Sequence, residues 1–203
     1  MDEAALIADA QRGGQRGLDA FNTLVLAHQS QVYHVAYRIL GTEATAADAT
    51  QEAFISAFKS IGNFRGGSFK SFILRTVTNT CFDVLRYNKR RPTTSLDGLA
   101  GDDVDEGDAT SGEEFLPSQD ENPADAAERG EIRRHIEHAM LRLPPDQRIT
   151  FVLSDVQGLS YDEIAEVMQT NLGTVKSRLS RARARLRDYL LGQAELLPEE
   201  YRL

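Results

Sequence analysis

Apolar residues recur along the chain at spacings of three and four, which is typical of α-helices that bury one face. No stretch reads convincingly as the alternating pattern of a half-buried β-strand. Glycine and proline residues interrupt the helical pattern and set the predicted helix ends. The predicted helices lie near residues 2–11, 18–40, 44–61, 68–90, 126–142, 145–156, 160–168 and 174–191. The pattern therefore predicts an all-α protein.

A segment without a sustained apolar period separates the first four predicted helices from the last four. Residues 92–127 are rich in Gly, Pro, Ser and Asp, a composition typical of disordered or extended linkers. We therefore predict two small helical domains, at residues 1–91 and 128–191, joined by this acidic linker. Residues 192–203 form a short tail to which the sequence assigns no function.

The acidic residues are concentrated around the linker, and this changes the meaning of the net charge of −8. Residues 92–128 contain 12 Asp and Glu and no Lys or Arg, so the rest of the chain has 23 basic and 19 acidic residues. One interpretation is a solvated tether, and the other is a polyanion that occupies a basic channel made for nucleic acid. Composition gives length and charge but no binding geometry, so it favours the tether.

Several classes of protein find no support in the sequence. No apolar run approaches the roughly 20 residues needed to cross a bilayer, and the acidic N-terminus lacks the basic start of a signal peptide. We therefore expect a cytoplasmic protein without membrane insertion. His135 and His138 share a helix face, but no second ligand pair lies nearby, so we expect no metal and no cofactor. We expect no enzymatic activity, because neither a phosphate-binding glycine loop nor a nucleophile elbow is present.

The strongest local pattern lies in residues 160–179, "SYDEIAEVMQTNLGTVKSRL". Ser160 and Glu163 form a predicted capping box that opens a short helix, and Thr174 can cap the next helix after a tight turn. A short helix, a turn and a second helix make a helix-turn-helix. This arrangement favours binding to duplex DNA.

The helix predicted from Thr174 has two different faces. At 100° per residue, an apolar stripe forms from Val175, Leu179, Ala182 and Leu186. The opposite face carries Ser177, Ser180, Arg181 and Ala184. The small side chains at its centre let a helix approach base edges closely. The flanks carry the cations Lys176, Arg178, Arg183, Arg185 and Arg187. A solvated basic helix is the alternative, but the cap, the turn and the stripe together favour DNA.

The helix predicted from Ser68 shows a different nucleic-acid pattern. Its inner face is formed by Ile73, Val77, Cys81, Val84 and Leu85. Its outer face is formed by Arg75, Asn79, Phe82, Arg86 and Arg90. Aromatic side chains interleaved with positive charge suit unstacked bases, and the preceding "NFRGGSF" loop lets backbone groups close around a base. Phe72 and Phe82 have a second interpretation as core residues.

Three segments resemble the extracytoplasmic-function (ECF) group of bacterial sigma-70 factors. They are "DATQEAFISAFKSIGNFRG" at 48–66, "VTNTCFDVLR" at 77–86, and "LPPDQRITFVLSDVQGLSYDEIAEVMQTNLGTVKSRLSRARARL" at 143–186. The resemblance covers region 2, at about 18–91, and region 4, at about 128–188. Two blocks in the right order make the resemblance specific, whereas a helix-turn-helix alone would not.

The resemblance implies a sigma factor that binds core RNA polymerase, recognises minus-35 and minus-10 promoter elements and promotes DNA opening. Region 4 is expected to bind minus-35 DNA through Thr174, Lys176, Ser177, Arg178, Ser180 and Arg181. Region 2 is expected to bind minus-10 DNA, with a flipped non-template base, through Phe64, Arg65, Ser68, Phe69, Arg75, Asn79 and Arg86. The polymerase-binding positions are expected at Asp48, Gln51, Glu52 and Ile55. The implied partners are the clamp helices of the largest polymerase subunit, the flap of the second largest, duplex and single-stranded promoter DNA, and an anti-sigma factor.

Two other interpretations stay open at this point. A dimeric helix-turn-helix regulator would bind duplex DNA without polymerase and would need a two-fold operator. An interaction protein that docks through its acidic linker would leave both basic surfaces unexplained. One residue departs from the family pattern, because Phe72 stands where the family usually has tryptophan.

Overall fold

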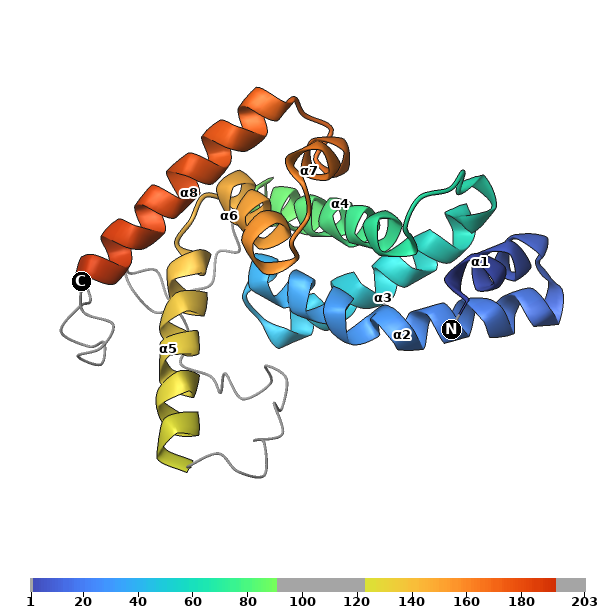
Figure 1. Ribbon diagram of the computed structural model, residues 1–203, viewed down its shortest axis with the longest axis horizontal. Helices are drawn as coiled ribbons and strands as arrows, with labels where there is room; N and C mark the ends of the chain where they lie inside the picture. The colour runs from blue at the N-terminus through green and yellow to red at the C-terminus, as the bar shows by residue number, and fades with distance from the viewer. Residues whose placement is uncertain (1, 91–122, 193–203) are drawn as a thin grey trace.

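The computed structural model describes residues 2–90 and 123–192, and these residues form helices and connecting turns without a strand (Figure 1). The first group contains α1 Glu3–Arg12, α2 Gly14–Leu40, α3 Glu43–Ser60, a 3₁₀ turn Ile61–Asn63 and α4 Phe69–Arg90. The second group contains α5 Pro123–Leu141, α6 Pro145–Phe151, a π-helical turn Val152–Val156, α7 Tyr161–Val167 and α8 Leu172–Gly192. The all-α prediction is confirmed. The predictions for residues 92–122 of the linker and for the tail from 193 lie outside the described residues.

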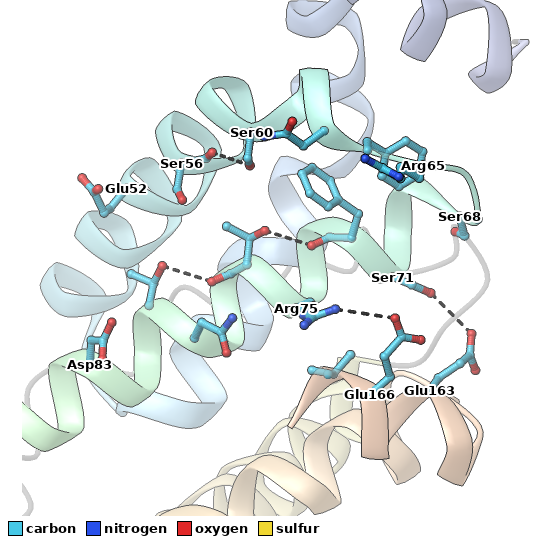
Figure 2. A pocket seen from close by; sticks show the side chains of 18 of the residues that line it. Glu52, Ser56, Ser60, Arg65, Ser68, Ser71, Arg75, Asp83, Glu163 and Glu166 are labelled. Carbon is cyan, nitrogen blue, oxygen red and sulfur yellow. Dashed lines mark hydrogen bonds and ion pairs between the residues drawn. The ribbon is translucent and has the colours of Figure 1, made fainter. Parts of the chain in front are cut away.

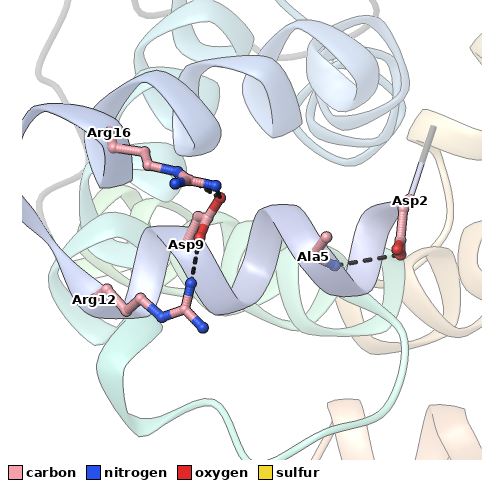
Figure 3. Close-up of polar contacts among 5 residues, drawn as sticks. All are labelled: Asp2, Ala5, Asp9, Arg12 and Arg16. Atoms are coloured by element: carbon pink, nitrogen blue, oxygen red, sulfur yellow. Dashed lines mark hydrogen bonds and ion pairs between the residues drawn. The ribbon is translucent and has the colours of Figure 1, made fainter.

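Helix α1 is fixed at its start and against α2 by two aspartates (Figure 3). The carboxylate of Asp2 accepts a hydrogen bond from the Ala5 amide and caps the helix. The carboxylate of Asp9 pairs with Arg12 at 2.7 Å and with Arg16 of α2 at 3.0 Å. These contacts join α1 to the first turn of α2.

Helix α2 begins at Gly14 rather than near Leu18, because Gly17 is a packing residue and does not end the helix. A Cβ atom at Gly17 would lie 2.9 Å from the Asp9 carbonyl oxygen of α1. Only glycine allows this approach, so the sequence pattern was misread as a break here. The buried side chains of α1, α2, α3 and α4 then form a continuous core.

The predicted inner face of α4 is confirmed for its first three members. Ile73, Val77 and Cys81 are fully buried, whereas Val84 and Leu85 are only half-buried near the end of the helix. Burial raises the pKa of the Cys81 thiol to about 12, so this residue behaves as a small apolar core residue.

The second group contains the predicted helix-turn-helix, α7 and α8. The capping box is confirmed: the Ser160 hydroxyl accepts from the Glu163 amide, and the Glu163 carboxylate accepts from the Ser160 amide at 2.8 Å. The predicted cap of α8 is wrong, because Asn171 Oδ1 accepts from the Thr174 amide at 2.8 Å and the helix starts two residues earlier than Thr174. The apolar stripe of α8 is confirmed as buried.

The two groups of helices pack against each other through α2, α4, α5, α6 and α7. The guanidinium of Arg148 on α6 is buried and donates to the carbonyl oxygen of Ile39, near the end of α2, at 2.6 Å. This burial lowers the pKa of Arg148. The division into domains at residues 91 and 128 stays a prediction, and α5 starts at Pro123, inside the predicted linker.

Candidate nucleic-acid interface

A cavity of about 1300 Å³ lies between α3, α4, α7 and the loop before α4 (Figure 2). It brings together residues that the sequence assigned to minus-10 DNA. These residues are Phe64, Arg65, Ser68, Arg75 and Asn79. Sequence reasoning missed the hydroxyl residues of the wall, because single hydroxyl side chains carry no distinguishing pattern. They are Ser56, Ser60, Ser71, Thr76 and Thr80. We call this cavity the α4 groove.

The loop at the mouth of the α4 groove depends on two glycines. Gly66 and Gly67 have φ angles of +97° and +96°, and no atom lies within 4 Å of a Cβ built on either residue. The left-handed backbone, rather than close packing, therefore requires glycine at both positions. This conformation leaves Arg65 and Ser68 exposed on the two sides of the turn.

The aromatic residues near the groove divide between core and surface. Phe69 is completely buried and packs edge-on against Phe21, with ring centroids 6.3 Å apart. This position corrects the expectation that Phe69 contacts DNA, since its side chain is part of the core. Phe64 and Phe72 are half-buried, with centroids 5.2 Å apart in an edge-to-face pair. Phe64 thus stays at the wall of the groove and Phe72 supports it.

One wall of the α4 groove is acidic and comes from α7 (Figure 2). Arg75 Nη1 lies 3.5 Å from Glu166 Oε1, and the Ser71 hydroxyl donates to the Glu163 carboxylate at 3.4 Å. Hydrogen bonds from the Ser160 amide and hydroxyl lower the pKa of Glu163. The carboxylate of Glu166 therefore occupies the position beside Arg75 where a phosphate would bind. Sequence patterns within one helix do not reveal this pair.

The outer face of α8 is the second candidate surface. Ser177, Ser180 and Arg181 are exposed on the side opposite the buried stripe, and Lys176 is exposed on the flank. Their arrangement matches the face predicted from helix geometry. Thr174 is half-buried in the first turn of α8, and its carbonyl accepts from the Ser177 hydroxyl at 3.0 Å.

Two arginines of α8 are held by carboxylates from α6 and the following turn. Arg178 donates to Asp146 at 2.6 Å, and Arg183 Nε donates to Asp155 at 3.0 Å. The hydrogen bonds from Arg183 to Asp155 raise the pKa of Arg183. These pairs fix α8 against α6 and the π-helical turn that follows it. The two aspartates were missed from sequence because they lie 32 and 28 residues away from their partners.

Helices α4 and α8 both line a further cavity of about 650 Å³, which shares no residue with the α4 groove. Arg86 and Lys89 of α4 line it together with Arg178 and Arg181 of α8. Arg86 therefore lies away from the α4 groove that holds the other predicted minus-10 residues, and it pairs with Asp83 at 3.3 Å.

The predicted polymerase-binding positions form an exposed stripe on α3. Asp48, Gln51, Glu52 and Ile55 are all exposed, and Ile55 has 40% of its surface accessible. Within the described residues, none of the three polar side chains makes a hydrogen bond or ion pair to another residue. Glu52 also faces the α4 groove, whereas the other three do not line it. This stripe is free to contact a partner.

The described residues contain neither a helix that could span a membrane nor a cluster of metal ligands. None of the helices in 2–90 and 123–192 is long and apolar enough to cross a membrane. Over the same residues, no three His, Cys, Asp or Glu side chains gather as metal ligands would.

Comparison with protein-family models matches both blocks of the chain. Residues 24–91 match sigma-70 region 2, and residues 133–186 match sigma-70 region 4. The ECF RNA polymerase sigma factor SigE of Mycolicibacterium smegmatis is 36% identical over 88% of this chain, which spans 64% of that protein's length. RNA polymerase sigma-H factor of Pseudomonas aeruginosa is 38% identical over 88% of both chains. The ECF RNA polymerase sigma-E factor of Escherichia coli K12 is 32% identical over 90% of this chain and 91% of its own.

Solved structures share the fold at lower sequence identity. CnrH, in complex with the cytosolic domain of CnrY, matches with a TM-score of 0.61 at 24% identity over 92% of this chain and 95% of CnrH. The sigma factor RpoE of Bartonella quintana, in complex with the anti-sigma factor NepR, matches with a TM-score of 0.63 at 24% identity over 84% of this chain and 96% of its own. With both regions matched in order and relatives aligned along most of its length, the chain belongs to the ECF group of sigma-70 RNA polymerase sigma factors.

Proposed function

We propose that this chain directs core RNA polymerase to promoters by dividing recognition between the outer face of α8 and the α4 groove. The observation that carries the proposal is the difference between these surfaces. The α8 face is one side of a single helix and exposes small residues between cations, which suits the major groove of a minus-35 duplex. The α4 groove is concave and combines Asn79 with Arg65 and Phe64, which suits an extruded minus-10 base.

The exposed stripe of α3 is the proposed contact with the clamp helices of polymerase. Its carboxylates and Ile55 are accessible without any rearrangement of the helices. RNA synthesis then belongs to polymerase, and this chain needs no catalytic residue of its own. We place the protein in the cytoplasm, where core polymerase acts. An anti-sigma factor is a proposed further partner, because RpoE of Bartonella quintana has this fold and is bound to one.

Binding of both promoter elements requires the two groups of helices to separate. Elements named for positions −35 and −10 lie about 25 base pairs apart, or about 85 Å along B-DNA. Arg86 of α4 and Arg181 of α8 line a single cavity in the structure. They cannot reach both elements from this arrangement, so α7 and α8 must move away from α4.

Transcription with purified core polymerase and a pool of candidate promoters tests the proposal. We expect specific transcripts only when this chain and core polymerase are both present. A footprint on a two-fold operator without polymerase would instead support a stand-alone regulator.

Asp48→Arg supplies the test of the α3 stripe in the same assay. It should weaken association with core polymerase and lower transcript yield from all promoters, while the circular dichroism spectrum stays unchanged. Asp19→Arg is the matched control, because Asp19 is exposed on α2, outside the stripe. Equal core affinity of both variants would remove α3 from the interface.

A further inference from the structure

The loop that frames the mouth of the α4 groove is held at both ends by α1. The side-chain amide of Gln11 donates to the Ile61 carbonyl at 3.1 Å and to the Phe64 carbonyl at 2.7 Å. The carboxylate of Glu3 accepts from the Phe69 amide at 3.2 Å. One helix therefore grips the start and the end of the segment that contains Arg65, Gly66, Gly67 and Ser68.

The chemistry of the two side chains suits these positions. A primary amide has two N–H donors, and Gln11 directs both at backbone oxygens of one turn. The amide of Phe69 is in the first turn of α4, where helix geometry supplies no partner for it. A carboxylate at a helix N-terminus also interacts favourably with the helix dipole, so Glu3 stabilises the start of α4.

Helix α1 is itself firmly placed, which a positioning element requires. Ile7 and Ala10 are buried in the core with 8% and 4% of their surface accessible. Its C-terminal half is in close contact with Gly17 of α2. The loop has no comparable packing at its tip, since no atom lies near Cβ positions built on Gly66 and Gly67.

We propose that Gln11 and Glu3 are positioning residues for base reading: they hold the 61–69 loop in the shape that receives the extruded minus-10 base, without touching DNA. This inference rests on the proposed function, which assigns the loop to minus-10 DNA. Gln11 fixes the N-terminal end of the loop, and Glu3 fixes its C-terminal end. Discrimination between bases depends on both, because a base pocket built from backbone and short side chains loses selectivity when its frame is loose.

The test uses holoenzyme made from core polymerase and full-length protein. The probes are four fluorescein-labelled single strands that carry the minus-10 element of the best-transcribed promoter and differ only at the extruded base. Gln11→Met keeps length and volume but removes both donors. The matched control is Gln15→Met, because Gln15 is exposed on α2 and bonds only to Asp19 within that helix. Glu3→Gln is the conservative variant that keeps an acceptor for the Phe69 amide.

In Gln11→Met we expect the ratio of dissociation constants between the worst and best base to fall about 5-fold, in line with the loss of two modest hydrogen bonds. Gln15→Met and Glu3→Gln should keep the wild-type ratio. Equal weakening of all four strands by Gln11→Met would overturn the proposal, because a general loss of affinity is not a loss of base reading. An unchanged ratio would overturn it as well.

Amide hydrogen exchange of the free protein separates this inference from the proposed function. In Gln11→Met, the amides of residues 64–68 should exchange several-fold faster, while those of α3 and α4 stay protected. Unchanged exchange in the loop would show that Gln11 does not hold it. If wild-type holoenzyme binds all four strands equally, the proposed function fails and base reading through Gln11 fails with it. Faster loop exchange in Gln11→Met would still show that Gln11 holds the loop.

Discussion

The α4 groove and the outer face of α8 contain the same cation, arginine, under different constraints. Arg75 in the groove is paired with Glu166, which comes from the other group of helices. Arg178 and Arg183 on α8 are paired with aspartates of their own group. Movement of α7 breaks the first kind of pair and leaves the second intact. In the proposed separation of the two groups, the partner of an arginine therefore decides whether the movement frees it.

The largest expected effect comes from the buried side of α8. Leu179 is 1% exposed in the core of the second group, so Leu179→Ala should lower the free energy of unfolding by about 2–5 kcal/mol. Urea denaturation followed by circular dichroism measures the loss, and Ser180→Ala on the exposed face is the control. Amide exchange should accelerate in α6, α7 and α8 but not in α2, α3 and α4. Equal acceleration in all of them would show that the two groups unfold as one unit.

The stripe around Leu179 also shows how much of the fold the sequence could predict. Successive members of the stripe are three or four positions apart, and the partners in the Ser160 capping box are three apart, so helix geometry alone located them. Gly17 was misread as a helix break because the close contact that requires glycine there is made with α1, a different helix. Glu166 beside Arg75 was not foreseen because the two residues are far apart in sequence and belong to separate groups of helices.

In the candidate site, too, local patterns were predictable and contacts between distant residues were not. The exposed side of α8 was predicted from its periodicity, and the assignment of Asn79 and the loop at 62–69 to minus-10 DNA came from the family resemblance. Phe69 was misplaced because it was grouped with the preceding loop, although it lies four residues before Ile73 and shares the buried face of α4. Gln11 bonds to Ile61 and Phe64, which are 50 and 53 positions away, and no local sequence pattern predicts contacts at such separations.

A smaller effect is expected to distinguish the exposed Arg181 of α8 from the paired Arg178. Arg181 is exposed, so Arg181→Ala should cost about 1–3 kcal/mol of binding to the preferred minus-35 duplex if it contacts a base. Arg178 is paired with Asp146, so Arg178→Ala should mainly reduce stability, by up to about 1 kcal/mol. Fluorescence anisotropy of holoenzyme on preferred and substituted duplexes measures the first loss, and urea denaturation the second. Equal losses of sequence preference in both variants would mean that Arg178 leaves Asp146 to bind DNA.

The smallest effect concerns the cap of α7, whose first turn carries part of the acidic wall of the groove. Ser160→Ala removes the hydroxyl from the capping box and should cost about 1 kcal/mol at neutral pH. The hydrogen bonds from Ser160 lower the pKa of Glu163 below its ordinary value of 4.5. The stability from this depressed pKa is therefore fully present above about pH 4.5 and is lost as the pH falls through the folded-state pKa. The stability difference between wild type and Ser160→Ala should accordingly narrow on acidification, in urea titrations between about pH 6 and pH 3. Glu163→Gln should show a shallower pH dependence than wild type over the same range. A stability difference between wild type and Ser160→Ala that stayed constant over this pH range would show that the interaction of Ser160 with Glu163 does not depend on the charge of the carboxylate. Packing alone would then hold the acidic wall in position.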